Sequence, residues 1–183
     1  LVNQHGFDKS FVIQVLKNAQ RRDEMLESVA NPAEKTKTWD DYKAIFIKKK
    51  RIIDGKNFIK KNIDVLQKAE DTYNVPKEVI TAILGIETNY GKNMGNFRVL
   101  DSLTTLGFDD PRRSKFFKSE LIQFFLLTRE NNLDILKTKG SYAGAMGFSQ
   151  FISSSYRAYA VDFDGDGYID LFNSVEDAIG SIA

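Results

Sequence analysis

The strongest pattern of apolar and polar positions along the chain lies between residues 76 and 90. Pro76 suits the first helical position, because its missing N–H is not needed there, and Gly91 suits a left-handed stop. Between them, apolar side chains recur at the three- and four-residue spacing of one helix face: Val79, Ile80, Ile83, Leu84, Ile86 and Tyr90. The pattern therefore predicts a single helix with defined ends.

One acidic residue, Glu87, falls on the apolar side of this helix. It follows Leu84 by three residues and Ile83 by four, whereas Lys77 and Glu78 mark the polar side. A carboxyl group among apolar neighbours resists ionisation, so its pKa should rise, and a raised pKa suits a general acid near neutral pH. The alternative is a structural role, in which Glu87 pairs with a neighbouring cation.

The remaining apolar positions predict further helices and very little strand. Asp8 can cap a first helix whose apolar face runs from Phe11 to Ala19. After a loop at 31–38, we expect helices over 39–51, with Trp39 among the packing residues, and over 58–73, with an interruption at Gly55. Another helix, over 111–131, carries a row of phenylalanines. The fold class is therefore mainly α, with a small helical domain over 1–74 and a second domain over 75–183.

Composition narrows the class of protein. The 183 residues are 42% hydrophobic with a formal net charge of +1, which suits a globular protein of one or two domains. The basic run Lys48–Arg51 is typical of a solvated helix face and lacks the patterned aromatics of a nucleic-acid site, although an anionic polymer stays open as a partner. The absence of Cys excludes disulfides and thiol chemistry. Because the chain starts at Leu1 without a signal-like segment, we expect a processed or trimmed chain that has lost its targeting information.

Residues 140–151 combine small, polar and aromatic side chains. Glycines and alanines among them would let a sugar face or a ligand backbone approach the main chain closely. Ser141 and Gln150 could supply the neutral hydrogen bonds that carbohydrate sites often need. The alternative is a tight crossing of two helices built on Gly and Ala, and the segment taken alone favours it.

A further motif begins at Asp162 and matches the opening of a calcium loop. Asp162, Asp164 and Asp166 offer carboxylates at positions 1, 3 and 5, Gly167 stands at position 6, and Tyr168 offers its backbone carbonyl at position 7. Acids this close repel one another unless a cation lies between them, so the motif predicts bound Ca²⁺. A single loop of this kind is more typical of a structural clamp than of a sensor.

The closing ligand of this loop stays open. Position 12 is Asn173, where a bidentate Glu is expected, so the last carboxylate must come from Glu176 or Asp177, and the loop would span 162–177. Ser174 and Asp177 also fit a capping box for the last helix, which is a competing role for Asp177.

Taken together, these motifs resemble the membrane-bound lytic transglycosylase B family, whose core is lysozyme-like. The resemblance covers most of residues 75–183, and the region of Trp39 and Tyr42 is similar, more weakly, to the helical domain that precedes the core. It rests on Gly85–Thr88, Tyr90-Gly91, Asp109–Arg113, Gly140–Phe148, Gln150-Phe151, Ser154–Tyr156, Ala160–Phe163 and Asp177–Ser181.

The resemblance implies cleavage of the MurNAc–GlcNAc β-1,4 bond of peptidoglycan without net addition of water. In this family a single Glu, matched by Glu87, protonates the glycosidic oxygen and then acts as base on the muramyl C6 hydroxyl, giving a 1,6-anhydro product. The substrate's N-acetyl group replaces a second carboxylate. Ser141 and Gln150 match polar residues of the sugar site, and Tyr42 and Arg112 are weaker matches in the groove.

The same resemblance implies peptidoglycan strands as partner, no nucleic acid, Ca²⁺ as a structural ion and no organic cofactor. It further implies a periplasmic protein, with a lost lipid anchor to the outer membrane and other cell-wall enzymes as candidate partners.

Three departures from the family pattern matter. Ile152-Ser153 stands where Met-Pro is common, the closing calcium ligand is displaced, and the chain stops at Ala183, where the family continues with aromatic and polar walls of the groove. We therefore expect a catalytic core whose C-terminal part is absent. Two other functions stay open: a muramidase-type hydrolase on the same scaffold, and a non-catalytic, calcium-stabilised wall-binding protein in which Glu87 is structural.

Overall fold

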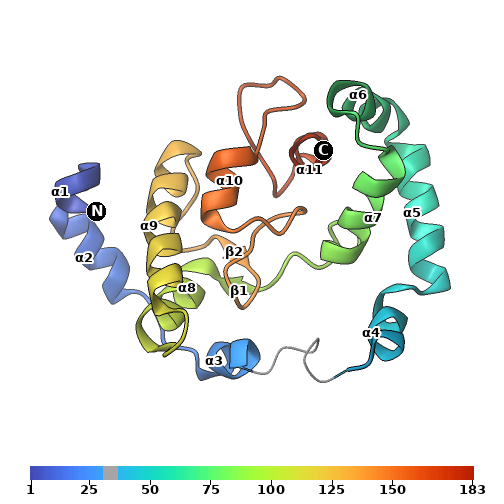
Figure 1. The fold of residues 1–183 in the computed structure, drawn as a ribbon. Coiled ribbons are helices and arrows are strands. Elements are labelled where there is room, and N and C mark those ends of the chain that lie inside the picture. The colour runs from blue at the N-terminus through green and yellow to red at the C-terminus, as the bar shows by residue number, and fades with distance from the viewer. Residues whose placement is uncertain (31–36) are drawn as a thin grey trace. The chain divides into compact units, whose positions relative to one another are not determined.

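A computed structural model describes residues 1–30 and 37–183 (Figure 1). Within these ranges the chain forms eleven helices and one two-stranded sheet, which confirms the mainly α prediction. None of the helices described there combines the length and the apolar character needed to cross a bilayer. The chain divides into two compact units: unit 1 contains residues 1–30, 95–145 and 152–157, and unit 2 contains 31–94, 146–151 and 158–183.

Unit 1 is built around α8 (Val99–Asp109) and α9 (Ser114–Glu130), which pack side by side (Figure 1). Every residue of α8 from Val99 to Gly107 is buried, and α9 covers it with buried side chains that include Phe117 and Phe125. Full burial of such a side chain is worth roughly 1.5–3 kcal/mol relative to exposure, so this pair forms the core of the unit. α9 also confirms the helix predicted from the row of phenylalanines.

The other elements of unit 1 are short. Asp8 accepts the backbone N–H of Phe11 at 2.8 Å and caps α2, as predicted. The buried Asp101 binds the Arg98 guanidinium and the backbone N–H of Gln20, which fastens the segment before α3 to α8. The short elements of unit 1 are α1 (Val2–His5), α2 (Lys9–Lys17), α3 (Asp23–Ala30), the antiparallel pair β1 (Phe97–Arg98) and β2 (Lys139–Gly140), and α10 (Ser153–Tyr159) up to Arg157.

Unit 2 has its core where α6, α7 and α11 meet the loop that precedes α11. The buried cluster comprises Leu66, Ala69, Ile80, Leu84, Phe163, Ala178 and Ile179. Only part of the apolar stripe predicted for α7 is buried. Val79, Ile83 and Ile86 are exposed, and the buried face of the helix includes small residues such as Gly85. The helices of the unit are α4 (Trp39–Phe46), α5 (Lys49–Lys61), α6 (Ile63–Tyr73), α7 (Lys77–Thr88) and α11 (Val175–Ile182).

The helix boundaries between residues 39 and 73 differ from the prediction. The expected helix over 39–51 is two helices, because the backbone leaves helical geometry at Ile47. The expected interruption at Gly55 is wrong: this glycine lies buried inside α5, where a Cβ would come 2.6 Å from the hydroxyl oxygen of Tyr90. Glycine serves a close approach here and not a break. The expected helix over 58–73 is divided at Asn62.

The structure also differs from the sequence prediction at Trp39 and at the boundary between the compact units. The packing role expected for Trp39 is wrong, because the side chain is 70% exposed and no residue of α4 is buried. The compact units also cut across the expected division at residue 74, since α3 packs on α8 whereas α5 and α6 pack on α7. The predicted loop at 31–38 lies outside the described residues except for its last two, where Thr38 caps α4.

Candidate active site

Glu87 lies in the last turn of α7. Its side chain is exposed, and it forms no hydrogen bond or ion pair with any residue that the structure describes. The protein around the carboxyl group still removes part of its hydration, and this partial burial raises the pKa of Glu87 above its ordinary value. The pKa shift therefore has the direction that the helix pattern predicts, and the cation that a structural role would require is not seen in the described part of the chain.

The end of α7 is fixed by three consecutive residues in the left-handed region, Asn89, Tyr90 and Gly91, with φ values of 52°, 61° and 83°. Thr88 Oγ1 accepts the N–H of Gly91 at 2.9 Å and donates to the carbonyl of Phe148 at 3.0 Å. A Cβ on Gly91 would lie 1.9 Å from the Phe148 ring, so this contact requires glycine. The helix therefore ends at its cap Asn89, two residues before the predicted stop. Thr88 belongs to the motif Gly85–Thr88 that carries the family resemblance, but local spacing predicted no role for its hydroxyl.

The Tyr90 ring ties α7 to α5. Its hydroxyl donates to the carbonyl of Arg51 at 3.0 Å, and its centroid lies 5.4 Å from that of Phe58. The ring fills a notch between Gly55 and Gly85, because a Cβ on either glycine would lie 2.6 Å from the phenol oxygen. Burial raises the pKa of Tyr90, so its hydroxyl stays a neutral donor. These contacts hold the helix that carries the acid.

Gln150 belongs to the same unit as Glu87. Its backbone is left-handed, with φ 49°, a conformation that costs a non-glycine residue of order 1–3 kcal/mol and is concentrated at functional sites. Its Nε2 donates to the carbonyls of Met94 at 3.2 Å and Gly147 at 3.0 Å. The amide nitrogen is therefore used within the protein, and Oε1 is left to accept a hydrogen bond from a ligand.

Tyr42 also lies in unit 2, on α4. The half-buried ring contacts Trp39 and Phe46, with centroid distances of 6.3 and 5.1 Å. An aromatic row thus follows α4 from its exposed first residue toward α5.

Ser141 and Arg112 belong to unit 1. Ser141 Oγ accepts the backbone N–H of Ala145 at 3.1 Å, which leaves the hydroxyl hydrogen free to donate. Arg112 is exposed, and its backbone N–H binds the Asp110 carboxylate at 2.7 Å. The helix crossing considered for residues 140–151 is wrong, because this segment forms a strand end, turns and an isolated bridge. Of the five residues predicted for catalysis or sugar binding, unit 2 therefore holds Glu87, Gln150 and Tyr42.

The acidic loop between α10 and α11 brings three carboxylates together. Oxygen atoms of Asp162, Asp164 and Asp177 lie within 4.8 Å of one another. Asp177 is 1% exposed and accepts backbone N–H groups of the loop at 2.7 and 2.8 Å, yet burial outweighs these bonds and raises its pKa. Ser174 Oγ accepts the N–H of Asp177 at 3.0 Å, which confirms Ser174 as the cap of α11, but the box is not closed, because the Ser174 N–H binds the carbonyl of Asp170. Asp177, and not Glu176, is thus the later acid that joins the group.

Other acids in the loop bind its backbone. Asp162 accepts N–H groups from residues 165–167, and these bonds lower its pKa despite the opposing effect of burial. Asp166 accepts the N–H of Tyr168 at 2.8 Å. Asp166 and Tyr168, both predicted as metal ligands, lie outside the group of three acids, and their part in binding a metal stays a prediction.

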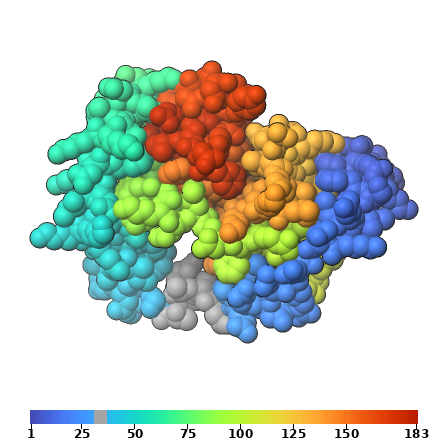
Figure 2. Space-filling view, turned by 180° about the vertical axis from the view of Figure 1, so that it is seen from behind, coloured from blue at the N-terminus to red at the C-terminus, as the bar shows by residue number. Residues whose placement is uncertain are grey.

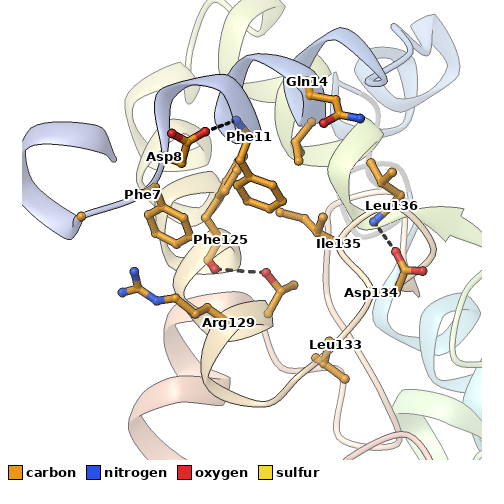
Figure 3. A pocket seen from close by; sticks show the side chains of 13 residues that line it. Phe7, Asp8, Phe11, Gln14, Phe125, Arg129, Leu133, Asp134, Ile135 and Leu136 are labelled. Carbon is orange, nitrogen blue, oxygen red and sulfur yellow. Dashed lines mark hydrogen bonds between the residues drawn. The ribbon is translucent and has the colours of Figure 1, made fainter.

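Unit 1 contains a cavity of about 610 Å³ beside α2 and the second half of α9 (Figure 3). The rings of Phe7, Phe11 and Phe125 line it, and its charged side chains are one cation, Arg129, and two acids, Asp8 and Asp134. None of the residues predicted for catalysis, sugar binding or metal binding belongs to its lining.

Comparison with known proteins shows close relatives. The family described as Transglycosylase SLT domain matches residues 1–183. The chain is 43% identical over 192 residues to membrane-bound lytic murein transglycosylase B of Escherichia coli (strain K12), which covers 100% of this chain and 53% of that protein.

Solved structures share the fold. The E. coli lytic transglycosylase Slt35 in complex with calcium is 44% identical with a TM-score of 0.92, covering 99% of this chain and 57% of that one. SltB3 from Pseudomonas aeruginosa in complex with NAG-anhNAM-pentapeptide is 31% identical with a TM-score of 0.87, covering 97% and 47%. The chain thus spans about half the length of these relatives. With its lysozyme-like fold and a match over its whole length, this chain belongs to the transglycosylase SLT domain family.

Proposed function

We propose that this chain is the catalytic core of a lytic transglycosylase that cleaves the MurNAc–GlcNAc β-1,4 bond of peptidoglycan and leaves 1,6-anhydro-MurNAc ends. One observation carries the proposal: the Glu87 carboxyl is unpaired among the described residues, reaches solvent and has a raised pKa. Family membership supports the reaction class, and the anhydro sugar named in the SltB3 complex supports the product.

In this mechanism Glu87 acts first as acid and then as base. Its proton moves to the glycosidic oxygen while the bond from that oxygen to C1 of MurNAc breaks. The carboxylate then takes the proton of the C6 hydroxyl as the C6 oxygen bonds to C1. The raised pKa favours the protonated Glu87 that the first step needs, and the second step restores that proton, so no water is consumed. The N-acetyl group of the substrate would stabilise the charge at C1, in place of a second carboxylate.

The predicted sugar-site residues supply neutral contacts. Gln150 can accept from a sugar hydroxyl or amide through Oε1, because its Nε2 is held by two backbone carbonyls. Ser141 can donate through its hydroxyl hydrogen, because its oxygen accepts from the backbone. Tyr42 and Arg112 are proposed as further contacts of the glycan strand.

We further propose that Ca²⁺ binds the acidic loop as a structural ion. The donor set fits a hard cation, since Asp162, Asp164 and Asp177 offer only oxygen and lie close together. The Asp166 carboxylate and the Tyr168 carbonyl complete the proposed ligands. The calcium complex of Slt35 supports this assignment. Bound there, the ion would neutralise the acids and join the loop to the first turn of α11; we propose no organic cofactor.

The proposed setting is the bacterial periplasm. Peptidoglycan strands are the proposed substrate, and no feature argues for nucleic acid. The name of the E. coli relative, which describes it as membrane-bound, supports association with the outer membrane and contact with other cell-wall enzymes.

Digestion of purified peptidoglycan, followed by mass spectrometry of the released muropeptides, tests the reaction. We expect products that are one water lighter than those of a hydrolase. Products with only reducing ends would instead identify a muramidase-type hydrolase. Binding to the wall without any released product would favour the non-catalytic alternative.

A further inference from the structure

Exposed isoleucines gather on the outer side of α5 and the turn before it, in unit 2. Ile47, Ile52 and Ile53 are 66%, 51% and 48% exposed. Single apolar residues are common on protein surfaces, but several together on one short segment mark a surface that meets something other than water. In Figure 2 the α5 segment, coloured teal, lies at the surface of the molecule.

Lysines without partners surround these isoleucines. The acid on the helix, Asp54, is taken by Lys50 and Lys92 at 3.1 and 2.9 Å. Other lysines of the segment are exposed and form no ion pair with any acid in the described ranges: Lys48, Lys49, Lys56, Lys60 and Lys61. Their charge therefore faces solvent uncompensated.

Helical spacing arranges the two kinds of side chain in one stripe. Lys49, Ile53, Lys56 and Lys60 follow one another at intervals of three and four residues within α5, so they lie on the same face. Ile52 stands beside this stripe, on the side that turns toward α7. The helix thus presents cations and apolar side chains to the same surroundings.

A groove of about 390 Å³ adjoins the stripe between α5 and α7. Apolar side chains form most of its wall, among them Phe46, Ile47, Ile52, Ile59 and Ile86. The cavity in unit 1 differs in the sign of its charge, because two acids, Asp8 and Asp134, stand against the single cation Arg129 in its lining (Figure 3). The surface in unit 2 instead pairs apolar area with an excess of cations.

We propose that this surface, defined by Ile47, Lys48, Lys49, Ile52, Ile53, Lys56 and Lys60 and called the α5 face, docks on an anionic phospholipid bilayer. Lysines beside apolar side chains match headgroup phosphates above acyl chains, as in helices that lie in the membrane interface. A water-soluble polyanion would satisfy the lysines and leave the isoleucines exposed. The proposal does not depend on the catalytic activity proposed above.

Sedimentation of the protein with vesicles tests the proposal. Wild type should bind phosphatidylglycerol–phosphatidylethanolamine vesicles and not phosphatidylcholine vesicles. The triple variant Lys49→Gln, Lys56→Gln, Lys60→Gln should weaken binding roughly a hundredfold, at about fivefold for each lysine near an anionic surface. The double variant Ile47→Ser, Ile53→Ser should weaken it by on the order of tenfold or more, since two side chains lose their apolar contact.

Matched controls lie elsewhere on the chain. Lys9→Gln, Lys17→Gln, Lys115→Gln removes the same charge, and Ile13→Ser, Ile63→Ser removes two exposed isoleucines (43% and 41%). Both controls should bind vesicles like wild type. Equal loss in the controls would overturn the proposal. Full binding by the isoleucine variant, or wild-type affinity for soluble polyaspartate equal to that for vesicles, would also overturn it, because either result would show adsorption of a polyanion without an apolar contact.

Discussion

Two acids of unit 2, Glu87 and Asp177, share the direction of their pKa shift and differ in exposure and in hydrogen bonding. Burial raises the pKa of both. Asp177 is almost wholly buried and accepts N–H groups of the loop backbone, whereas Glu87 reaches solvent and has no partner among the described residues. A raised pKa therefore does not by itself identify a catalytic acid. What separates the two is whether hydrogen bonds already occupy the carboxylate.

This difference assigns separate consequences to the two side chains. Removing a carboxylate that orders a loop should lower the free energy of unfolding, because buried N–H groups are left without acceptors. Removing a carboxyl group that has no partners should lower turnover and leave the free energy of unfolding nearly unchanged, because the fold does not depend on it.

The largest expected effect is the loss of activity in Glu87→Gln. The amide keeps the shape of the side chain but can neither donate the required proton nor take one back, so turnover should fall about 10³-fold or more. Anhydro-muropeptide release measures it. Glu78→Gln, which changes an exposed acid in the first turn of the same helix, should keep wild-type turnover. Unchanged turnover in folded Glu87→Gln would remove Glu87 from the chemistry.

Next in size is the stability loss in Asp177→Ala. Backbone donors of the loop would lose their buried acceptor, so the free energy of unfolding should fall by about 2–4 kcal/mol. Urea unfolding followed by circular dichroism measures the change. The neighbouring Glu176→Ala should stay within about 0.5 kcal/mol. If Glu176→Ala were the more damaging variant, the acid assigned to close the loop would be wrong.

Removal of calcium should have a comparable or smaller effect. An ion that binds only the folded state at about a hundredfold its Kd adds about 2.7 kcal/mol, so chelation should lower the Tm by about 5–10 °C. Differential scanning calorimetry with calcium or chelator measures the shift, and Asp162→Asn should abolish it. A Tm that ignores both calcium and chelator would count against a bound ion.

The smallest effect is the pH dependence of turnover. Glu87 must be protonated at the start of the reaction, so kcat/KM should fall as pH rises through its pKa, by up to about tenfold per pH unit. Because partial burial raises this pKa, the fall should begin above the ordinary range of a glutamic acid. Initial rates across a pH series measure it. A fall within the ordinary range would contradict the assigned burial effect.

Local signals in the sequence predicted part of the fold well. The caps Asp8 and Ser174 and the helix of phenylalanines depend on neighbours along the chain, and the structure confirms them. The interruption predicted at Gly55 was wrong, because this glycine makes room for the ring of Tyr90, a residue far along the chain. Such a contact leaves no trace in local periodicity.

The candidate site shows the same limit. The motif around Asp162 predicted a group of acids, and three of them do lie together. The hydrogen bond from Thr88 to Phe148 joins segments 60 residues apart, so no spacing rule could find it. The roles of Ser141, Gln150, Tyr42 and Arg112 in binding sugar stay predictions.

Turnover per folded molecule, measured side by side in Glu87→Gln and Asp177→Ala, tests the catalytic role of Glu87 most directly. The folded fraction comes from circular dichroism, and product release is divided by it. We expect Glu87→Gln to be folded and almost inactive, while the folded fraction of Asp177→Ala works at nearly the wild-type rate. Folded Glu87→Gln that still releases anhydro-muropeptides at the wild-type rate would contradict it.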